Sequence, residues 1–274
     1  MTQSHHLRAI IFDLDDTLID WSGQSMLWED YLVPRCTAVY EHLAAAGYTF
    51  PITPLELTQL VHTISVNEWQ IAKQTWHGAS LRVVWHKVLL ELGLAPEQFD
   101  VESLLQIHGW GPFPGVTLFV DTLPVLNSLR QQGYQLGLIT NSYHPMWMRD
   151  IELRHFGLSD YFPVRLCSGD VGYMKPHPAI FWHLLDQLQI PPAQAMYVGD
   201  RPINDVAGAN SAGMISVWLN LPHLQRDLEG IQPHYTIRQL TELLPLVHRL
   251  ECGTQAFPDV QPDVRQSLTN NGTS

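Results

Sequence analysis

The sequence predicts an α/β protein with a doubly wound, Rossmann-like parallel sheet and an all-helical segment inserted after the first strand. Two observations lead to this fold class. Short apolar runs without polar alternation recur and are separated by helical patterns, which is typical of parallel strands covered on both faces. Between the first strand and residue 109, apolar residues recur at helical spacing alone. The 274 residues, 45% of them hydrophobic, suffice for such a core.

The first part of the chain is expected to hold one strand and the helical insert. Pro34 should kink or break the first inserted helix, because proline lacks the backbone N–H that helix interiors use. Gly47 ends that helical region, and Gly93 ends the last inserted helix in the manner of a C-cap. The expected elements are a strand at 8–13, a polar turn at 19–24, helices at 26–43, 55–71 and 81–92, and a linker at 110–115.

The second part is expected to alternate between helices and strands. These are helix 118–132, strand 134–139, helix 145–155, strand 163–167, helix 178–188, strand 195–198, short helix 205–212, strand 215–219 and a final helix at 236–247. The predicted domains are a core of residues 1–18 and 112–250 and a helical insert of residues 19–111. Residues 253–274 are rich in Gln, Pro, Asp, Thr, Asn and Gly and predict a disordered tail.

The charge balance restricts the class of partner. Asp and Glu number 27 against 15 Lys and Arg, a formal charge of −12. This argues against a nucleic-acid partner, because binding to phosphate backbones relies on clustered basic residues. A small phosphate ester stays compatible with the acidity, because one lysine and one bound divalent cation can supply the local positive field.

Other patterns indicate a cytoplasmic protein without a membrane partner. No window reaches the roughly 18 apolar residues of a membrane helix, and no signal-peptide pattern is present. Cys36, Cys167 and Cys252 are far apart and are interpreted as reduced packing cysteines. The fourteen histidines include no His-Glu-x-x-His pair, so surface roles are favoured over a zinc site.

Two carboxylates at the end of the first strand are the first candidates for chemistry. Asp13 and Asp15 alternate with Leu14, so they project to the same side of the extended chain. Two like charges this close destabilise one another unless a cation lies between them or one carries a proton. The pair could therefore combine a metal-bound nucleophile with a proton donor and acceptor. Alone, it could equally be an Asp-rich turn.

Three further polar groups lie at the ends of later strands or in a loop between two of them. Thr140 and Asn141 end one strand, Lys175 lies in a proline-rich loop, and the segment from Asp200 to Asp205 follows another strand. Individually they could be a turn, a surface lysine and helix-capping residues, and Asp205 is expected to cap the following helix. Jointly they favour a site, because ligands of open parallel sheets bind at the carboxyl ends of the strands.

These motifs resemble those of the haloacid dehalogenase (HAD) superfamily of hydrolases. The matching segments are Asp13-x-Asp15-x-Thr17, Thr140-Asn141, Lys175 and Gly199-Asp200-x3-Asn204-Asp205. The position of the insert is similar to the subgroup with a helical cap between the first two motifs. The resemblance implies a central strand order of 5-4-1-2-3 and a cap that closes over the site.

The resemblance also implies a role for each matching residue. Asp13 is expected to attack phosphorus and form an aspartyl-phosphate, and the side chain of Asp15 to act as general acid and then base. Asp13, Asp200 and the backbone carbonyl of Asp15 are expected to bind Mg²⁺, with Asp205 outside them or joined through water. The remaining expected ligands of the phosphoryl oxygens are Thr140, Asn141 and Lys175. Thr17 is expected to support the loop.

Several functions stay open beside the favoured phosphatase. Asp15 favours phosphoester chemistry over dehalogenation, because an alkoxide leaving group needs a proton and a halide does not. A phosphomutase shares the same residues but has to shield its intermediate from water. A non-catalytic binding protein of this fold predicts the loss of at least one motif residue, and none is lost.

The substrate and the oligomeric state are not determined by these motifs. A small soluble phosphate ester is the expected substrate, and the protein could be a monomer or a homodimer. Side chains of the insert and of the turn before it are expected to select the substrate, although tryptophans at helical spacing are more often core residues. The candidates are Trp21, Trp28, Glu29, Trp69, Trp76, Arg82, Trp85 and His86.

Overall fold

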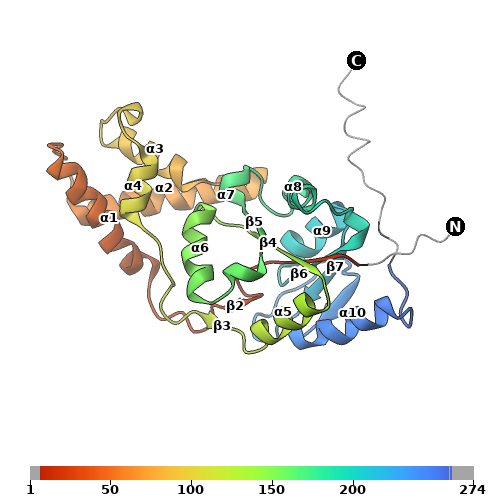
Figure 1. Cartoon of the computed structure of the whole chain (residues 1–274). Helices are drawn as coiled ribbons and strands as arrows, with labels where there is room; N and C mark the ends of the chain where they lie inside the picture. The colour runs from red at the N-terminus through yellow and green to blue at the C-terminus, as the bar shows by residue number, and fades with distance from the viewer. Residues whose placement is uncertain (1–6, 259, 261–274) are drawn as a thin grey trace, which may run out of the picture.

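The computed structural model describes residues 7–258 and residue 260. The sheet and the helices that cover it lie at one end of the molecule, and the helices inserted after the first strand lie beside them at the other end (Figure 1). The predicted disordered tail, residues 253–274, lies mostly outside the described residues.

The main sheet has six parallel strands. They are β1 Ala9–Phe12, β4 Gln135–Thr140, β5 Val164–Cys167, β6 Ala195–Gly199, β7 Ile215–Leu219 and β8 Tyr235–Ile237. The order across the sheet is β5-β4-β1-β6-β7-β8, and every neighbouring pair is parallel. Counted along the chain within the core, the first five strands have the predicted order 5-4-1-2-3, which is confirmed. The sixth strand, β8, extends the sheet beyond β7.

The central strand β1 explains why both faces of the sheet are covered. Its residues alternate in direction, so Ile10 and Phe12 belong to one hydrophobic cluster while Ala9 and Ile11 belong to another. The first cluster includes residues of α5 Thr122–Gln131, α6 Met146–His155 and α10 Leu243–Glu251. The second includes residues of α8 Pro178–Leu188 and α9 Gly208–Ser211. The predicted doubly wound class is therefore confirmed.

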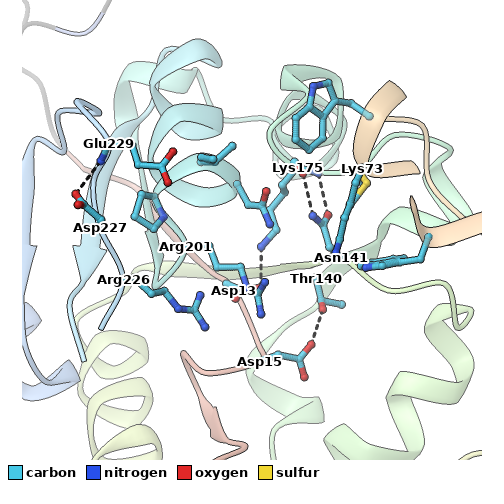
Figure 2. A pocket seen from close by; sticks show the side chains of 16 residues that line it. Asp13, Asp15, Lys73, Thr140, Asn141, Lys175, Arg201, Arg226, Asp227 and Glu229 are labelled. Atoms are coloured by element: carbon cyan, nitrogen blue, oxygen red, sulfur yellow. Dashed lines mark hydrogen bonds and ion pairs between the residues drawn. The ribbon is translucent and has the colours of Figure 1, made fainter. Parts of the chain in front are cut away.

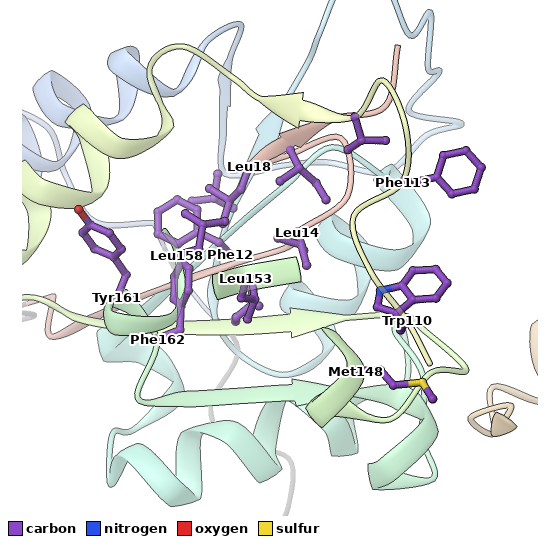
Figure 3. Packing of buried hydrophobic residues seen from close by; sticks show 14 of the residues in the cluster. Phe12, Leu14, Leu18, Trp110, Phe113, Met148, Leu153, Leu158, Tyr161 and Phe162 are labelled. Carbon is purple, nitrogen blue, oxygen red and sulfur yellow. The ribbon is translucent and has the colours of Figure 1, made fainter. Parts of the chain in front are cut away.

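The loop after β1 is anchored in the first of these clusters. Leu14 and Leu18 are fully buried beside Phe12, and Leu153 and Phe162 approach them from the segment after β4 (Figure 3). Burial of apolar side chains contributes about 25 cal/mol per Å² removed from water. Asp13 and Asp15 of this loop are thus carried on a backbone that hydrophobic packing holds in place.

The insert consists of four helices. They are α1 Trp28–Ala45, α2 Pro54–Thr75, α3 Leu81–Glu91 and α4 Val101–His108. Thr53 caps α2 through a capping box with Glu56. The break predicted at Pro34 is not found, and α1 continues through this residue. Buried residues on both sides of it, Leu32 and Cys36, hold the helix across the missing hydrogen bond. The division at residues 18/19 and 111/112 stays a prediction.

Three local predictions are wrong at element ends. Residues Ile19–Asp20, expected as a turn, form β2 and pair antiparallel with β3, Thr117–Leu118, which was expected to begin a helix. Residues Tyr235–Ile237 form β8 instead of helix, since aromatic and β-branched side chains suit a strand that can pair with β7. The final helix α10 begins only at Leu243.

The insert also contacts the core through the loop between α2 and α3, away from β2 and β3. The loop between α2 and α3 lies against the loop that precedes Lys175: the Gly78 N–H donates to the Gly172 carbonyl at 3.0 Å, and the Met174 N–H to the Trp76 carbonyl at 3.0 Å. A Cβ on Gly78 would lie 2.0 Å from the Ser168 carbonyl oxygen, so this approach requires glycine. The insert is thereby held over the carboxyl edge of the sheet.

The cysteines and the helix hydropathy test two smaller predictions. All three cysteines are free; Cys36 and Cys167 are buried, as packing residues should be, whereas Cys252 is exposed and the packing interpretation is wrong for it. Within residues 7–258, no helix has the length and apolarity that crossing a bilayer requires.

Candidate active site

The predicted site residues converge at the carboxyl ends of β1, β4 and β6. Asp13, Asp15, Thr140, Asn141 and Lys175 line one cavity of about 660 Å³, and Figure 2 shows their side chains directed toward one another. The two other predicted residues lie directly behind this cavity and are almost completely buried (Asp200 and Asp205).

Lys175 joins the acidic residues into one cluster. Its ammonium nitrogen Nζ donates to Asp13 Oδ1 at 2.6 Å, to Asp205 Oδ1 at 2.7 Å and to the Tyr197 hydroxyl at 2.8 Å. An ammonium group has three donors, so all of them are used. Burial lowers the pKa of Lys175, but Asp13 and Asp205 outweigh this effect and raise the pKa above its ordinary value. Lys175 is therefore charged, and it neutralises part of the buried acidity.

The charge of Lys175 does not balance every carboxylate. Burial raises the pKa of Asp13 to about 6, although Lys175 opposes the shift. The pKa of Asp200 is raised further, by burial and by the charges of Asp13 and Asp205, against the opposing charge of Arg226. The cluster therefore carries more negative charge than its own cations offset, which is the electrostatic condition for binding a further cation.

Asp15 has a different environment from Asp13. Its Oδ1 accepts from Arg149 Nη2 at 2.7 Å and from Trp21 Nε1 at 2.8 Å, and its Oδ2 accepts from the Thr140 hydroxyl at 3.1 Å. Burial alone would raise the pKa of Asp15, but the Arg149 charge and these hydrogen bonds lower it below the ordinary value. Asp15 is accordingly an ionised carboxylate in this arrangement.

Arg149 is a site residue that the sequence analysis missed. It lies on α6 and is buried, and its Nη1 pairs with Glu152 at 3.1 Å while its Nη2 holds Asp15. Burial raises the pKa of Glu152 to about 7, with Arg149 opposing the shift. The position of Arg149 in the sequence could have indicated that it is buried. Arg149 precedes the buried Leu153 by four residues, so it belongs to the face of α6 that packs on the core.

Asn141 and Thr140 are engaged with the protein itself. The Asn141 side chain accepts from the Lys175 N–H at 2.8 Å and donates to the Lys175 carbonyl at 2.9 Å, so it positions the backbone that carries the ammonium. The Thr140 hydroxyl donates to Asp15. Their expected contacts with phosphoryl oxygens stay predictions.

Asp205 does not begin a helix as predicted. It lies within one helical turn, Pro202–Ala207, and its Oδ2 accepts from the backbone N–H of Arg201 at 2.8 Å. A Cβ on Gly199 would lie 2.4 Å from the Asp205 carboxylate, so the glycine before Asp200 is what allows this approach. Between them, the Arg201 N–H and Lys175 occupy both carboxylate oxygens of Asp205.

Three carboxylates have the placement that a hard divalent cation requires. One oxygen each of Asp13, Asp200 and Asp205 lies within 4.8 Å of the others, and all three residues are buried. Oδ2 of Asp200 accepts no hydrogen bond, although the Arg226 guanidinium lies beside it and also contacts Asp16 at 2.9 Å. Buried oxygen donors with excess negative charge fit Mg²⁺. The residues present thus suit the predicted ion.

The candidate specificity residues divide into two groups. Four tryptophans line cavities at the site: Trp21, Trp28, Trp69 and Trp76. The others do not: Trp85 is fully buried, His86 is exposed, Arg82 pairs with Glu102 and Asp170, and Glu29 pairs with His62. Arg82 therefore joins the insert to the core rather than facing a substrate.

The raised pKa of Asp13 predicts a pH-dependent effect of Asp13→Asn on stability in EDTA. Between about pH 4 and pH 6 the folded protein keeps a proton on Asp13 that the unfolded chain loses, so rising pH removes stability from the wild type. Asparagine does not ionise. The melting temperature of the variant relative to wild type should therefore increase from about pH 4.5 to about pH 7.5. A difference that is constant or decreasing over this range would contradict the assigned environment of Asp13.

Comparison with known proteins identifies the family. A family model described as haloacid dehalogenase-like hydrolase matches residues 7–213. The chain belongs to the haloacid dehalogenase-like hydrolases. The predicted family is therefore confirmed, and the motifs that indicated it lie inside the matched range.

Named relatives match nearly the whole chain. The pyrimidine 5′-nucleotidase YjjG of Escherichia coli is 34% identical over 87% of this chain and 96% of its own. The glyceraldehyde 3-phosphate phosphatase of Pyrococcus furiosus is 34% identical over 89% and 94%. Among solved structures, the 2-haloacid dehalogenase from Pseudomonas syringae pv. Tomato has a TM-score of 0.58 and 25% identity, covering 89% of this chain and 99% of that one.

Proposed function

We propose that this hydrolase is a Mg²⁺-dependent phosphatase that cleaves a small phosphomonoester through an aspartyl-phosphate on Asp13. The observation that carries the proposal is the pair of carboxylates in one cavity: Asp13 beside the Lys175 ammonium, and Asp15 held by Arg149. The two relatives named above for phosphate-ester hydrolysis support the reaction class.

In the first step an oxygen of Asp13 attacks phosphorus, and the bond from phosphorus to the leaving oxygen breaks. Lys175 is placed to stabilise negative charge at this carboxylate and at the phosphoryl oxygens. Asp15 gives a proton to the leaving oxygen. Because a bound phosphate dianion favours the protonated form of a neighbouring carboxyl, substrate binding counteracts the Arg149 charge at this step.

In the second step a water molecule attacks phosphorus and releases inorganic phosphate and Asp13. The ionised form of Asp15, which Arg149, Trp21 and Thr140 stabilise, is the form that accepts the proton of this water. The site thus provides the base directly, whereas the acid depends on the charge of the bound substrate.

The carboxylates of Asp13, Asp200 and Asp205, with the Asp15 backbone carbonyl, are the proposed surroundings of Mg²⁺. When bound, the ion supplies positive charge to the transferring phosphoryl group and to the buried acidic cluster. Asp200, almost completely buried and with one oxygen that accepts no hydrogen bond, is the strongest candidate for a direct ligand.

Two alternatives use the same fold. The structural similarity to a haloacid dehalogenase makes dehalogenation one alternative. A halide leaving group needs no proton, however, so Asp15 would have no role as an acid in that reaction. A phosphomutase needs an intermediate shielded from water, whereas Asp15 here is prepared to activate water. Hydrolysis of a phosphomonoester is the reaction that uses both carboxylates.

The proposal also covers the cellular location, the partner and the oligomeric state. The three free cysteines support the predicted cytoplasmic location. A small-molecule phosphate ester remains the proposed partner, and the monomeric or homodimeric state remains a prediction.

Metal removal tests the proposed function. Phosphate release from 4-nitrophenyl phosphate and from a panel of metabolite phosphates should occur with Mg²⁺ and stop in excess EDTA, because the carboxylate cluster needs the added cation. Readdition of Mg²⁺ should restore it, which excludes irreversible unfolding as the cause. If the folded protein released phosphate equally well with EDTA, or released none from any ester with Mg²⁺, the proposal would be wrong.

A further inference from the structure

A second cavity continues from the phosphate site toward the insert. Its volume is about 530 Å³, and it shares Asp15, Trp69, Asn141 and Arg201 with the first cavity. Asp15 is the group proposed to protonate the leaving oxygen. The second cavity therefore begins where the leaving group departs, and its chemistry bears on the substrate. This inference rests on the proposed phosphatase function.

The walls of this cavity are mainly aromatic. They include four indoles and a phenol, from the turn after β2, from α1, from α2, from the linker after α4 and from the loop after β4: Trp21, Trp28, Trp69, Trp110 and Tyr143. Trp69 and Tyr143 meet edge to face, with 6.1 Å between ring centroids and 69° between the ring planes, and both are half-buried. Such rings offer faces on which a planar group can stack.

The charged groups of the cavity are already balanced. Arg149 pairs with Asp15 and Glu152, and Asp16 pairs with Arg226. Arg201 interacts with the buried carboxylates of the phosphate site. His62 pairs with Glu29, so each of these basic side chains already has an acidic neighbour, which disfavours leaving groups that carry a carboxylate or another phosphate.

Uncharged polar side chains lie between the aromatic side chains of this cavity, among them Asn141 and Ser142. Ser65 and Gln70 of α2 line the cavity, and so does the buried His144, whose Nε2 has no hydrogen-bond partner among the described residues. Burial lowers the pKa of His144 well below its ordinary value, so the ring is neutral. Aromatic faces with polar groups between them suit a planar heterocycle, which can stack on the rings and form hydrogen bonds at its polar edge.

We propose that the substrate is a nucleoside monophosphate whose base occupies this tryptophan-lined cavity. The volume supports a leaving group of this size, since pockets of roughly 300 to 1,000 Å³ hold ligands larger than a triose. Trp69 is the principal specificity residue, because it lines both cavities and lies opposite Tyr143.

Paired substrates test the proposal on the full-length protein. With Mg²⁺, kcat/KM for at least one of uridine, cytidine, adenosine or guanosine 5′-monophosphate should exceed that for ribose 5-phosphate by about tenfold or more, the usual scale of base stacking. Glyceraldehyde 3-phosphate and 4-nitrophenyl phosphate complete the panel. The first lacks a base, and the second has an aromatic ring without a sugar.

A substitution tests whether Trp69 is responsible for the preference for a nucleotide over ribose 5-phosphate. Trp69→Ala should lower kcat/KM for the preferred nucleotide by about tenfold, mainly through KM, and change that for ribose 5-phosphate less than about twofold. Trp69→Phe should restore most of the kcat/KM that Trp69→Ala loses. It also tests the role of the aromatic ring if Trp69→Ala does not fold. Trp182→Ala is the matched control, because Trp182 lies on α8 outside both cavities and should leave the ratio of the two substrates unchanged.

The outcomes separate this inference from the function on which it rests. If ribose 5-phosphate or glyceraldehyde 3-phosphate is hydrolysed as well as every nucleotide, the nucleoside proposal is overturned while the phosphatase function stands. An equal loss for both substrates in Trp69→Ala and Trp69→Phe overturns the role of Trp69. If no ester releases phosphate, the proposed function itself fails.

Discussion

Asp13→Asn is expected to abolish phosphate release, with a decrease in kcat of about 10⁴-fold or more, the scale seen when a covalent nucleophile is removed. Asparagine cannot form the acyl-phosphate, and it also takes a charge from the cluster that is proposed to hold Mg²⁺. Steady-state release from the best ester of the panel measures the effect. Intact mass of acid-quenched protein should show an added phosphoryl group in wild type and none in the variant.

The control for this variant is Asp160→Asn, which removes an exposed carboxylate that lines neither cavity of the site. It should keep wild-type activity. Because Asp13 is buried at a raised pKa, Asp13→Asn should fold and melt at least as high as wild type near neutral pH in EDTA. A folded Asp13→Asn protein with turnover within tenfold of wild type would eliminate Asp13 as the nucleophile.

Asp15→Asn is expected to lower kcat by about 10²- to 10⁴-fold for an alkyl phosphate, the usual contribution of a general acid and base. The loss in the first step should be smaller for 4-nitrophenyl phosphate, because its leaving group departs with little need of a proton. Water activation is impaired for both esters, so the phosphorylated protein should accumulate. Rapid-quench kinetics with both esters measures the two steps separately.

Asp20→Asn provides the comparison for this variant. Asp20 ends the neighbouring strand β2, and its side chain accepts from the Ser22 N–H rather than from any site residue. Its activity should stay close to wild type. An identical loss for both esters without accumulation of phosphorylated protein would mean that Asp15 acts only by shaping the loop.

The contact between Asp15 and Arg149 explains why the two carboxylates can have different roles. Asp13 lies among other acidic residues and has a raised pKa, whereas Asp15 accepts three hydrogen bonds, one of them from a guanidinium, and has a lowered pKa. Groups that begin from opposite shifts are suited to nucleophilic attack and to proton transfer respectively. The difference comes from α6 rather than from the motif that holds both residues.

Local patterns in the sequence were enough to predict a parallel sheet and the convergence of Asp13, Asp15, Lys175 and Asp200, whereas its strand order was predicted from the family resemblance that the motifs carry. Each of these residues follows an apolar strand or lies in the loop beside one, and the parallel arrangement alone brings strand ends to one edge. Residues 236–237 were assigned to helix because a three-residue strand at a sheet edge becomes evident only through its pairing with β7.

Only the tertiary structure showed which groups meet at that edge. Arg149 lies 134 residues from Asp15 along the chain and Arg226 lies 210 from Asp16, and no local pattern records such pairs. The same holds for the aromatic cavity, whose tryptophans come from the turn, the insert and the linker. The sequence alone determined the fold and the reactive groups, since these depend on periodicity and short motifs. The packing of α6 and the other core elements determined the charge states of these groups, and the packing of the insert on the core formed the aromatic cavity, because ion pairs and stacking depend on distances in space.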